Sequence, residues 1–139
     1  MSCESTNATC IPIGPTGAAG FSYEYASGGI ISIVWVNAVD TLVTGAAHTI
    51  TGGTDEYTID VNLTTLNLGT STGNVKIKVD GVTVKQSTNL ILPASSHSTY
   101  SVTYRGTIAD GALVEVYVAG TIAGLSATTQ EYSWSITKL

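Results

Sequence analysis

Few residues in this chain are of the types that perform acid–base or nucleophilic chemistry. The sequence has two histidines, His48 in "GAAHTITGG" and His97 in "PASSHSTYS", and both segments are polar and typical of turns. Serines are abundant, but a serine nucleophile needs a base and a group that orients the base. No P-loop, HExxH or CxxC signature occurs. We therefore expect exposed loop histidines and no enzyme, and a hydrolase on a β scaffold is the weakest alternative.

Metal-ligating residues are equally sparse. Cys3 and Cys10 are the only cysteines, and two thiols without a nearby histidine do not make a zinc site. They are expected either to be free or to form a disulfide. Asp55 and Glu56 in "GGTDEYT" lack the spacing of acids that a calcium loop has, so a turn with two solvated acids is favoured. The sequence predicts no metal and no cofactor.

The charge pattern bears on the partners. Only 11% of the residues are charged and the net charge is −5, with three of the five basic residues in "KIKVDGVTVK". Binding to a phosphate backbone requires several clustered cations, so we expect no nucleic acid and interpret these lysines as the solvent face of a hairpin.

No signal peptide opens the chain and no apolar run approaches 18 residues. Synthesis in a host cytoplasm and no membrane contact are therefore expected.

The elements that must position these residues are strands. Apolar residues alternate with polar ones in several segments from residue 22 onward: 57–64, 75–79, 100–105, 114–118 and 132–136. This period of two is typical of half-buried strands. The Asp80–Gly81 pair between two alternating runs predicts a hairpin, in which Val82 and Val84 resume the apolar face. Near the start, "GIISIVWVNAV" is apolar throughout, so we expect a strand that is covered on both faces.

These strands predict an all-β fold. Many short strands at intervals of 8–12 residues indicate a sandwich, a jelly roll or a barrel, and no window favours a helix. An immunoglobulin-type sandwich is the main alternative, although the cysteine–tryptophan–cysteine pattern of that fold is absent.

Between a polar arm and the first strand lies a short collagen-like segment. Gly14, Gly17 and Gly20 fall three residues apart, with Pro15 after the first of them. A glycine at every third position fits the crowded axis of three chains, but so few triplets do not hold a triple helix together. Joined to a domain that is already trimeric, the three segments meet at high effective concentration. The sequence therefore predicts a homotrimer.

Three segments together resemble a known family. They are "GPTGAAG" at 14–20, "GALVEVYVAGT" at 111–121 and "YSWSITKL" at 132–139. The combination is similar to the trimeric jelly rolls of the complement-component and tumour-necrosis-factor superfamily, including fibre heads of tailed phages and collagen-like spore-surface proteins. The resemblance implies that the final strand lies beside the trimer axis, so that Tyr132, Trp134 and Ile136 would form the trimer interface. Packing in the core of one subunit is the alternative for these three side chains.

We expect three regions along the chain. Residues 1–13 form an anchoring arm, in which Cys3, Cys10, Ile11, Pro12 and Ile13 would contact a particle; residues 14–21 form the collagen-like stub; residues 22–139 form a jelly-roll β-sandwich head. The predicted function is a non-enzymatic virion structural protein, a trimeric capsid decoration protein or short head fibre of a tailed phage, at the virion surface. A receptor- or glycan-binding fibre head and a bacterial spore or surface collagen-like protein are the alternatives.

Overall fold

A computed structural model describes residues 5–6, 8–9, 22–67, 71–87, 90–92, 96–120 and 127–139. All regular structure in these residues is β. The short strands β1 (Ser5–Thr6) and β2 (Ala8–Thr9) pair with each other. The described part of residues 22–139, which we call the head, contains nine strands: β3 (Ser22–Val34), β4 (Thr41–Thr49), β5 (Asp55–Asn67), β6 (Ser71–Val79), β7 (Val82–Gln86), β8 (Leu90–Leu92), β9 (Ser96–Ile108), β10 (Leu113–Gly120) and β11 (Ala127–Lys138).

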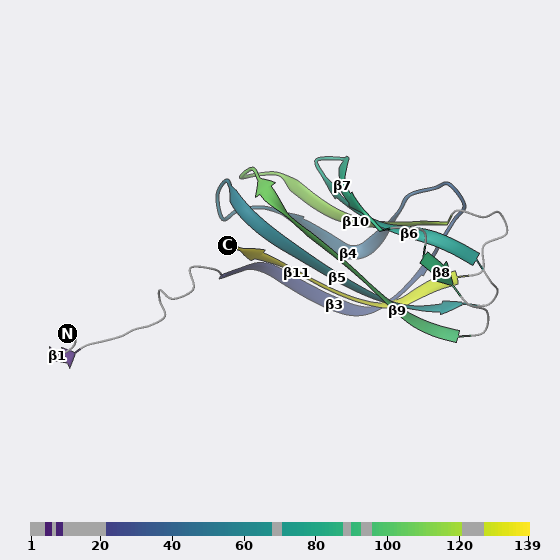
Figure 1. The fold of residues 1–139 in the computed structure, drawn as a ribbon, viewed down its shortest axis with the longest axis horizontal. Coiled ribbons are helices and arrows are strands. Elements are labelled where there is room, and N and C mark those ends of the chain that lie inside the picture. Colours follow the sequence, from purple (N-terminus) through teal and green to yellow (C-terminus); the bar gives the residue numbers. More distant parts are fainter. Residues whose placement is uncertain are drawn as a thin grey trace.

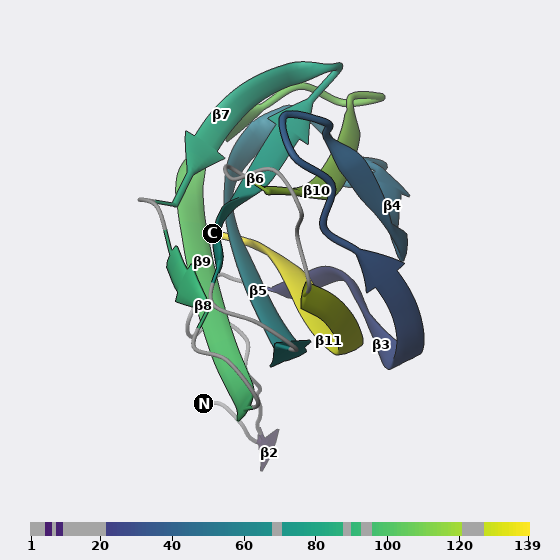
Figure 2. The same cartoon turned by 90° about the vertical axis from the view of Figure 1, so that its right-hand side faces the viewer.

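The strands of the head form two antiparallel sheets that face each other (Figures 1 and 2). One sheet has the order β3-β11-β5-β9, and the other has the order β4-β10-β6-β7, with β8 added beside β6. The first long strand thus pairs with the last, and the pairs β4–β10, β5–β9 and β6–β7 nest inside it. This is the strand order of a hairpin rolled up on itself, so the all-β sandwich is consistent with a jelly roll.

The core lies between the two sheets and is supplied by alternate residues of each strand. Tyr57, Ile59, Val61 and Leu63 of β5 are buried, as the period of two predicts. Val114, Val116 and Val118 of β10 face them from the other sheet. Trp35, immediately after β3, is fully buried, and its Nε1 donates a hydrogen bond to Thr129 Oγ1 at 2.6 Å. A buried indole nitrogen needs such a partner, which fixes the ring between the sheets.

The predicted hairpin is confirmed between β6 and β7. Asp80 and Gly81 both have positive φ angles, of 49° and 80°, as a two-residue turn of this kind requires. Val84 is half-buried, as predicted, but Val82, next to the turn of the hairpin, is 65% exposed.

One prediction about the strands is wrong. The segment "GIISIVWVNAV" is not covered on both faces, because nothing in the described part of the single chain packs on the outer face of β3. Ile31 and Ile33 pack against the core, whereas Ile30 is 89% exposed and Val34 is 52% exposed. The continuous apolar run therefore combines an inner row with an outer row that the chain leaves uncovered.

Candidate functional site

The outer face of the β3-β11-β5-β9 sheet carries small polar side chains in register. Two rows run across it, one of Ala26, Ser135, Asp60 and Thr103 and the other of Gly28, Ser133, Asn62 and Ser101. Each row contains one residue from each of the four strands. The period of two that sends Trp134 into the core sends Ser133 and Ser135 to this face.

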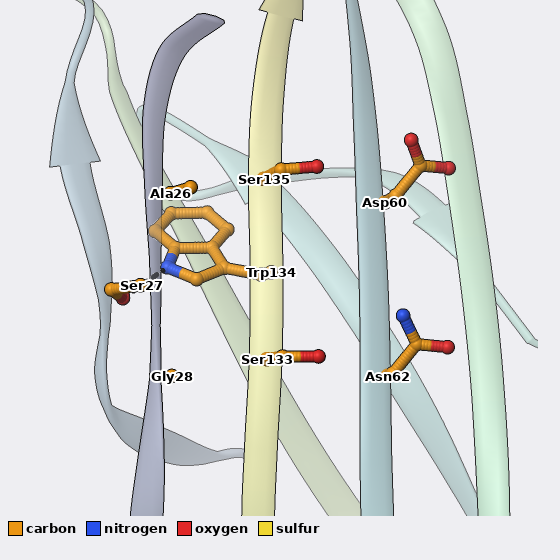
Figure 3. A pocket seen from close by; sticks show the side chains of 8 residues that line it. All are labelled: Ala26, Ser27, Gly28, Asp60, Asn62, Ser133, Trp134 and Ser135. Atoms are coloured by element: carbon orange, nitrogen blue, oxygen red, sulfur yellow. Dashed lines mark hydrogen bonds between the residues drawn. The ribbon is translucent and has the colours of Figure 1, made fainter.

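These rows enclose a shallow hollow of about 410 Å³ (Figure 3). The hydroxyls of Ser133 and Ser135 extend from β11 toward β5, and the side chains of Asn62 and Asp60 extend in the same direction from β5 toward β9. On the β3 side of the hollow lie Ala26 and Gly28, which have at most a methyl group and so leave the hollow unfilled. A second hollow of about 240 Å³ shares Asn62 and Ser133 and continues along the same strands. Together the two hollows form an elongated depression, which we call the polar trough.

Cross-strand hydrogen bonds orient the taller side chains of the trough. Ser101 Oγ donates to Asn62 Oδ1 at 2.6 Å, and Thr103 Oγ1 donates to Asp60 Oδ1 at 2.9 Å. These bonds leave the Asn62 amide nitrogen, the second Asp60 oxygen and the Ser133 and Ser135 hydroxyls available to a ligand within the described part of the chain. The trough therefore presents both donors and acceptors at fixed positions.

The three residues predicted for the trimer interface lie behind this face. Tyr132, Trp134 and Ile136 are all buried in the core of the single chain. Trp134 is 3% exposed; its Nε1 donates to Ser27 Oγ at 2.9 Å, and Tyr25 meets its ring edge-on. Their burial agrees with the alternative of core packing. A contact of these residues with a second chain stays a prediction, because a single chain does not test it.

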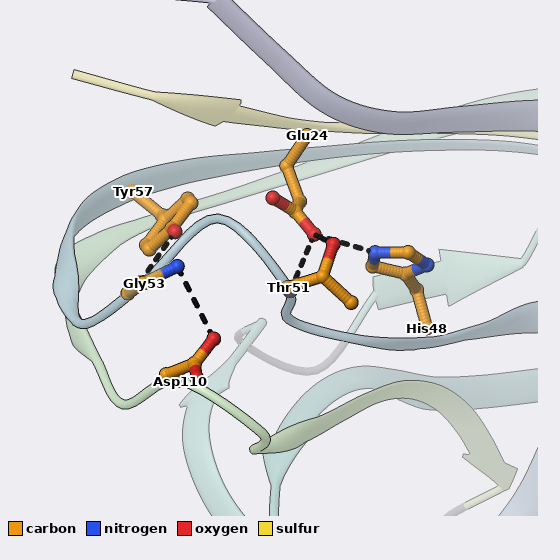
Figure 4. A network of polar contacts seen from close by, with 6 residues as sticks. All are labelled: Glu24, His48, Thr51, Gly53, Tyr57 and Asp110. Carbon is orange, nitrogen blue, oxygen red and sulfur yellow. Dashed lines mark hydrogen bonds and ion pairs between the residues drawn. The ribbon is translucent and has the colours of Figure 1, made fainter.

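A second polar cluster joins the start of β3 to β4 and to the loop after β4 (Figure 4). One oxygen of Glu24 accepts hydrogen bonds from the Thr51 backbone nitrogen at 2.8 Å and from the Thr51 hydroxyl at 3.0 Å, and it lies 2.8 Å from His48 Nε2. The side chains of Glu24 and His48 are only 5% and 18% exposed. Tyr25 stacks on the His48 ring with the centroids 4.3 Å apart.

These contacts set the charge state of Glu24. Burial alone would raise its pKa, but the hydrogen bonds from His48 and Thr51 and the charge of His48 hold the pKa below its ordinary value. Nearby, burial raises the pKa of Tyr57, and the charges of Glu24, Asp55 and Asp110 act in the same direction. Glu24 is therefore a buried anion that ties two sheets together.

The expectation of a loop position for His48 is wrong, whereas His97 is exposed as expected but lies on β9. His48 is in β4 and is held by a carboxylate and an aromatic ring. The cluster has no arrangement of nucleophile and base, because the Thr51 hydroxyl donates to Glu24 and not to His48. No sequence signal links Glu24 with His48, since they are 24 residues apart on strands of different sheets.

The segment "GTSTG" at 69–73 matches the pattern G-x-S-x-G of nucleophile elbows. Such an elbow places its serine at a sharp turn between a strand and a helix. Here Ser71 begins β6, and the strand continues to Val79 without a helix. The match therefore lacks the context that the chemistry needs.

Other charged residues form surface pairs. Glu56 binds Arg105 at 2.8 Å, and Asp55 lies 3.6 Å from Lys138. Asp40 contacts both Lys76 and Lys78 at 2.7 Å, and hydrogen bonds from these lysines lower the pKa of Asp40.

In the described ranges no group of three or more histidine, cysteine or acidic residues is arranged to hold a metal ion. The described residues also contain no helix that is long and apolar enough to span a membrane.

Several predicted residues lie outside those that the structure describes. They are the arm residues Cys3, Cys10, Ile11, Pro12 and Ile13 and the stub residues Gly14, Pro15, Gly17 and Gly20.

Comparisons with known proteins add little about function. No protein-family model and no curated protein sequence match the chain. Among solved structures, the Eiger TNF of S. frugiperda is 15% identical with a TM-score of 0.48, covering 72% of this chain and 68% of that one. The EclA C-terminal domain, a sugar-binding protein, is 20% identical with a TM-score of 0.46 over 87% and 86% of the two chains. A family 35 carbohydrate-binding module of Clostridium thermocellum is 14% identical with a TM-score of 0.42 over 84% and 98%. Similarity at this level carries no conclusion about ligand or activity.

Proposed function

We propose that this chain is a non-enzymatic structural protein, the homotrimeric jelly-roll head of a decoration protein or short fibre on a tailed phage. The observation that carries the proposal is a set of exposed apolar side chains in and just after β3. Ile30 and Val34 lie on the outer face of β3, and Val36 and Val39 lie in the segment between β3 and β4; we call these four residues the β3 apolar edge.

An edge of this kind favours association with another chain. β3 is 13 residues long and contains no lysine, arginine or proline, the residues with which edge strands commonly resist pairing. Its outer side exposes Ile30 almost completely, and exposed apolar side chains that follow one another mark contact surfaces. Copies of this same chain are the proposed partners, because the glycine triplets before β3 imply three chains that begin side by side.

The proposed trimer also accounts for the position of the collagen-like stub. β3 begins at Ser22, immediately after the triplets, and three heads in contact would bring their stubs together. In this proposal the arm of residues 1–13 attaches the trimer to a capsid or another virion protein. With so few triplets, the head would stand close to that surface, which favours a decoration protein over a long spore filament.

The experiment is sedimentation of the full chain in a reducing buffer, so that the cysteines do not cross-link it. Three copies of 14.3 kDa should sediment as one particle of about 43 kDa. Ile30→Lys should give a folded monomer, because the side chain is exposed in the single chain and its replacement leaves the core intact. Val82→Lys is the matched control, since Val82 is an exposed valine on the other sheet, and this variant should remain trimeric.

A wild-type monomer at micromolar concentration would refute the proposed trimer and with it the explanation of the triplets. A trimer in which Ile30→Lys sediments like the wild type would keep the assembly but exclude the β3 apolar edge as its contact.

A further inference from the structure

We propose that the polar trough on the β3-β11-β5-β9 sheet binds a neutral, extended oligosaccharide through hydrogen bonds to its hydroxyl groups. The residues assigned to the contact are Ser133 and Ser135 of β11 together with Asn62 and Asp60 of β5. This inference uses a different set of side chains from the β3 apolar edge, and the binding itself does not rest on the proposed trimer.

The open groups of the trough suit a ligand that is rich in hydroxyls. A serine hydroxyl both donates and accepts, the Asn62 amide nitrogen donates, and the free Asp60 oxygen accepts. A sugar hydroxyl also donates and accepts, so neighbouring hydroxyls can pair with two of these groups at once. Ser101 and Thr103 hold the amide and the carboxylate in place, so little side-chain ordering is left for binding.

The spacing of the rows favours an extended ligand over a compact one. Neighbouring strands lie about 4.8 Å apart, and residues on one face of a strand repeat at about 6.7 Å. The hollow beside Ser133 and Asn62 continues toward Thr64 and Glu131, which lengthens the depression along the strands. A single sugar ring would cover only part of this array, whereas an oligosaccharide would meet both rows.

Charge selects against acidic glycans. None of the residues that line the two hollows is basic, while Asp60 and Glu131 are acidic and the chain as a whole has a net charge of −5. A uronic acid or a phosphate would therefore meet repulsion without a compensating cation. The ligand class that fits is neutral.

A protein partner is less suited to this face. The centres of protein–protein interfaces are enriched in aromatic residues, methionine and arginine and depleted in serine and aspartate. The trough has the opposite composition, since its one tryptophan, Trp134, is buried beneath it. Without an exposed ring for stacking, each trough should bind weakly, with a Kd on the order of 1 mM.

The test is NMR titration of the full chain with neutral hexasaccharides of glucose, mannose or galactose as the probes. At least one of them should shift the side-chain amide of Asn62 and the backbone amides of Ser133 and Ser135 in a saturable way. Asn62→Ala should weaken that binding roughly fivefold to tenfold, as loss of about one hydrogen bond predicts. Ala26→Leu should weaken it by filling the trough, and Thr83→Ala, at an exposed position on β7, should leave it unchanged.

Three outcomes would overturn the inference. They are the absence of such shifts with every neutral hexasaccharide up to about 10 mM, equal affinity in wild type and both trough variants, and binding to hexagalacturonate alone. Val39→Lys reports separately on the proposed trimer: it should weaken the assembly, and it should bind the same hexasaccharide with unchanged affinity per site, because Val39 lies after β3 and outside the trough.

Discussion

At the scale of single residues, Glu24 is the most constrained charge in the head. Its carboxylate meets two donors from Thr51 and the imidazole of His48, and it is almost fully covered. An anion taken out of water is tolerated only when such partners replace the lost hydration. The cluster links β3, an edge strand of its sheet, to β4 of the other sheet.

The lowered pKa of Glu24 predicts how stability depends on pH. In the unfolded chain this carboxyl has its ordinary pKa of 4.5, and in the folded chain the pKa is lower. The stabilisation is thus fully present above pH 4.5 and is lost as the pH falls through the folded pKa. We expect the melting temperature of Glu24→Gln to lie below that of the wild type at pH 7 and to approach it at pH 3. Thermal unfolding across this range measures the difference.

Glu56→Gln is the control for this experiment. The pKa of Glu56 is also lowered, by a hydrogen bond from Arg105, but that pair is exposed to solvent. Exposed pairs contribute little to stability, so the pH profile of this variant should nearly follow the wild type. If Glu24→Gln has the same profile as Glu56→Gln, the buried cluster does not stabilise the fold in the way described.

Prediction from sequence is weakest at this scale. Glu24 and His48 meet only because two strands of different sheets lie face to face, and nothing local to either residue signals this. The alternation in the last strand predicts that serine and threonine form its polar face. The sequence does not predict that this face aligns with Asn62 and Asp60, because the alignment depends on the register between β11 and β5.

At the scale of elements, alternation and turn chemistry predicted most of the strands. The β6–β7 hairpin follows from Asp80 and Gly81, and the inner rows of β5, β10 and β11 follow from a period of two. β3 was misjudged because a continuous apolar run does not reveal whether another layer covers each face of the strand. A strand with an exposed apolar outer row has the same sequence pattern as a strand that is covered on both faces.

Packing around Gly45 of β4 provides a prediction about an element. Gly45 has a φ of 92°, and a Cβ atom at this position would collide with the Tyr132 hydroxyl. Gly53 has a φ of 91°, but a Cβ atom there would meet no neighbour within 4 Å. Gly53→Ala should therefore lower the free energy of unfolding only by its backbone strain, about 1–2 kcal/mol. Gly45→Ala should cost clearly more, as measured by urea denaturation.

Both variants strain the backbone in the same way, because both glycines have a φ near 90°. The difference between their free energies of unfolding therefore measures the collision with Tyr132. The double variant Gly45→Ala/Tyr132→Phe removes the hydroxyl that collides and should recover part of the loss. Equal costs for the two single variants would mean that Tyr132 does not pack against β4 as described.

At the scale of the whole molecule, the nested pairing of the strands places first and last strands side by side. β11 supplies core residues on one face and trough residues on the other, and β3 beside it supplies the apolar edge. The core thus lies on one face of these two neighbouring strands, and the trough and Ile30 lie on the other face, where Ile30 is opposite Glu131. A core variant and a trimer-contact variant can be distinguished by whether the melting temperature still depends on protein concentration.

The last prediction uses this dependence for Trp134. If folding is coupled to trimer formation, the melting temperature of the wild type rises with protein concentration. Trp134 is buried in its own chain, so Trp134→Ala should cost about 3–5 kcal/mol and lower the melting temperature by a similar amount across a hundredfold dilution. Ile30→Lys should do the opposite, removing the concentration dependence at little cost to the single chain, because Ile30 lies outside the core. The reverse pattern, with a monomeric Trp134→Ala and a trimeric Ile30→Lys, would place the final strand at the trimer axis.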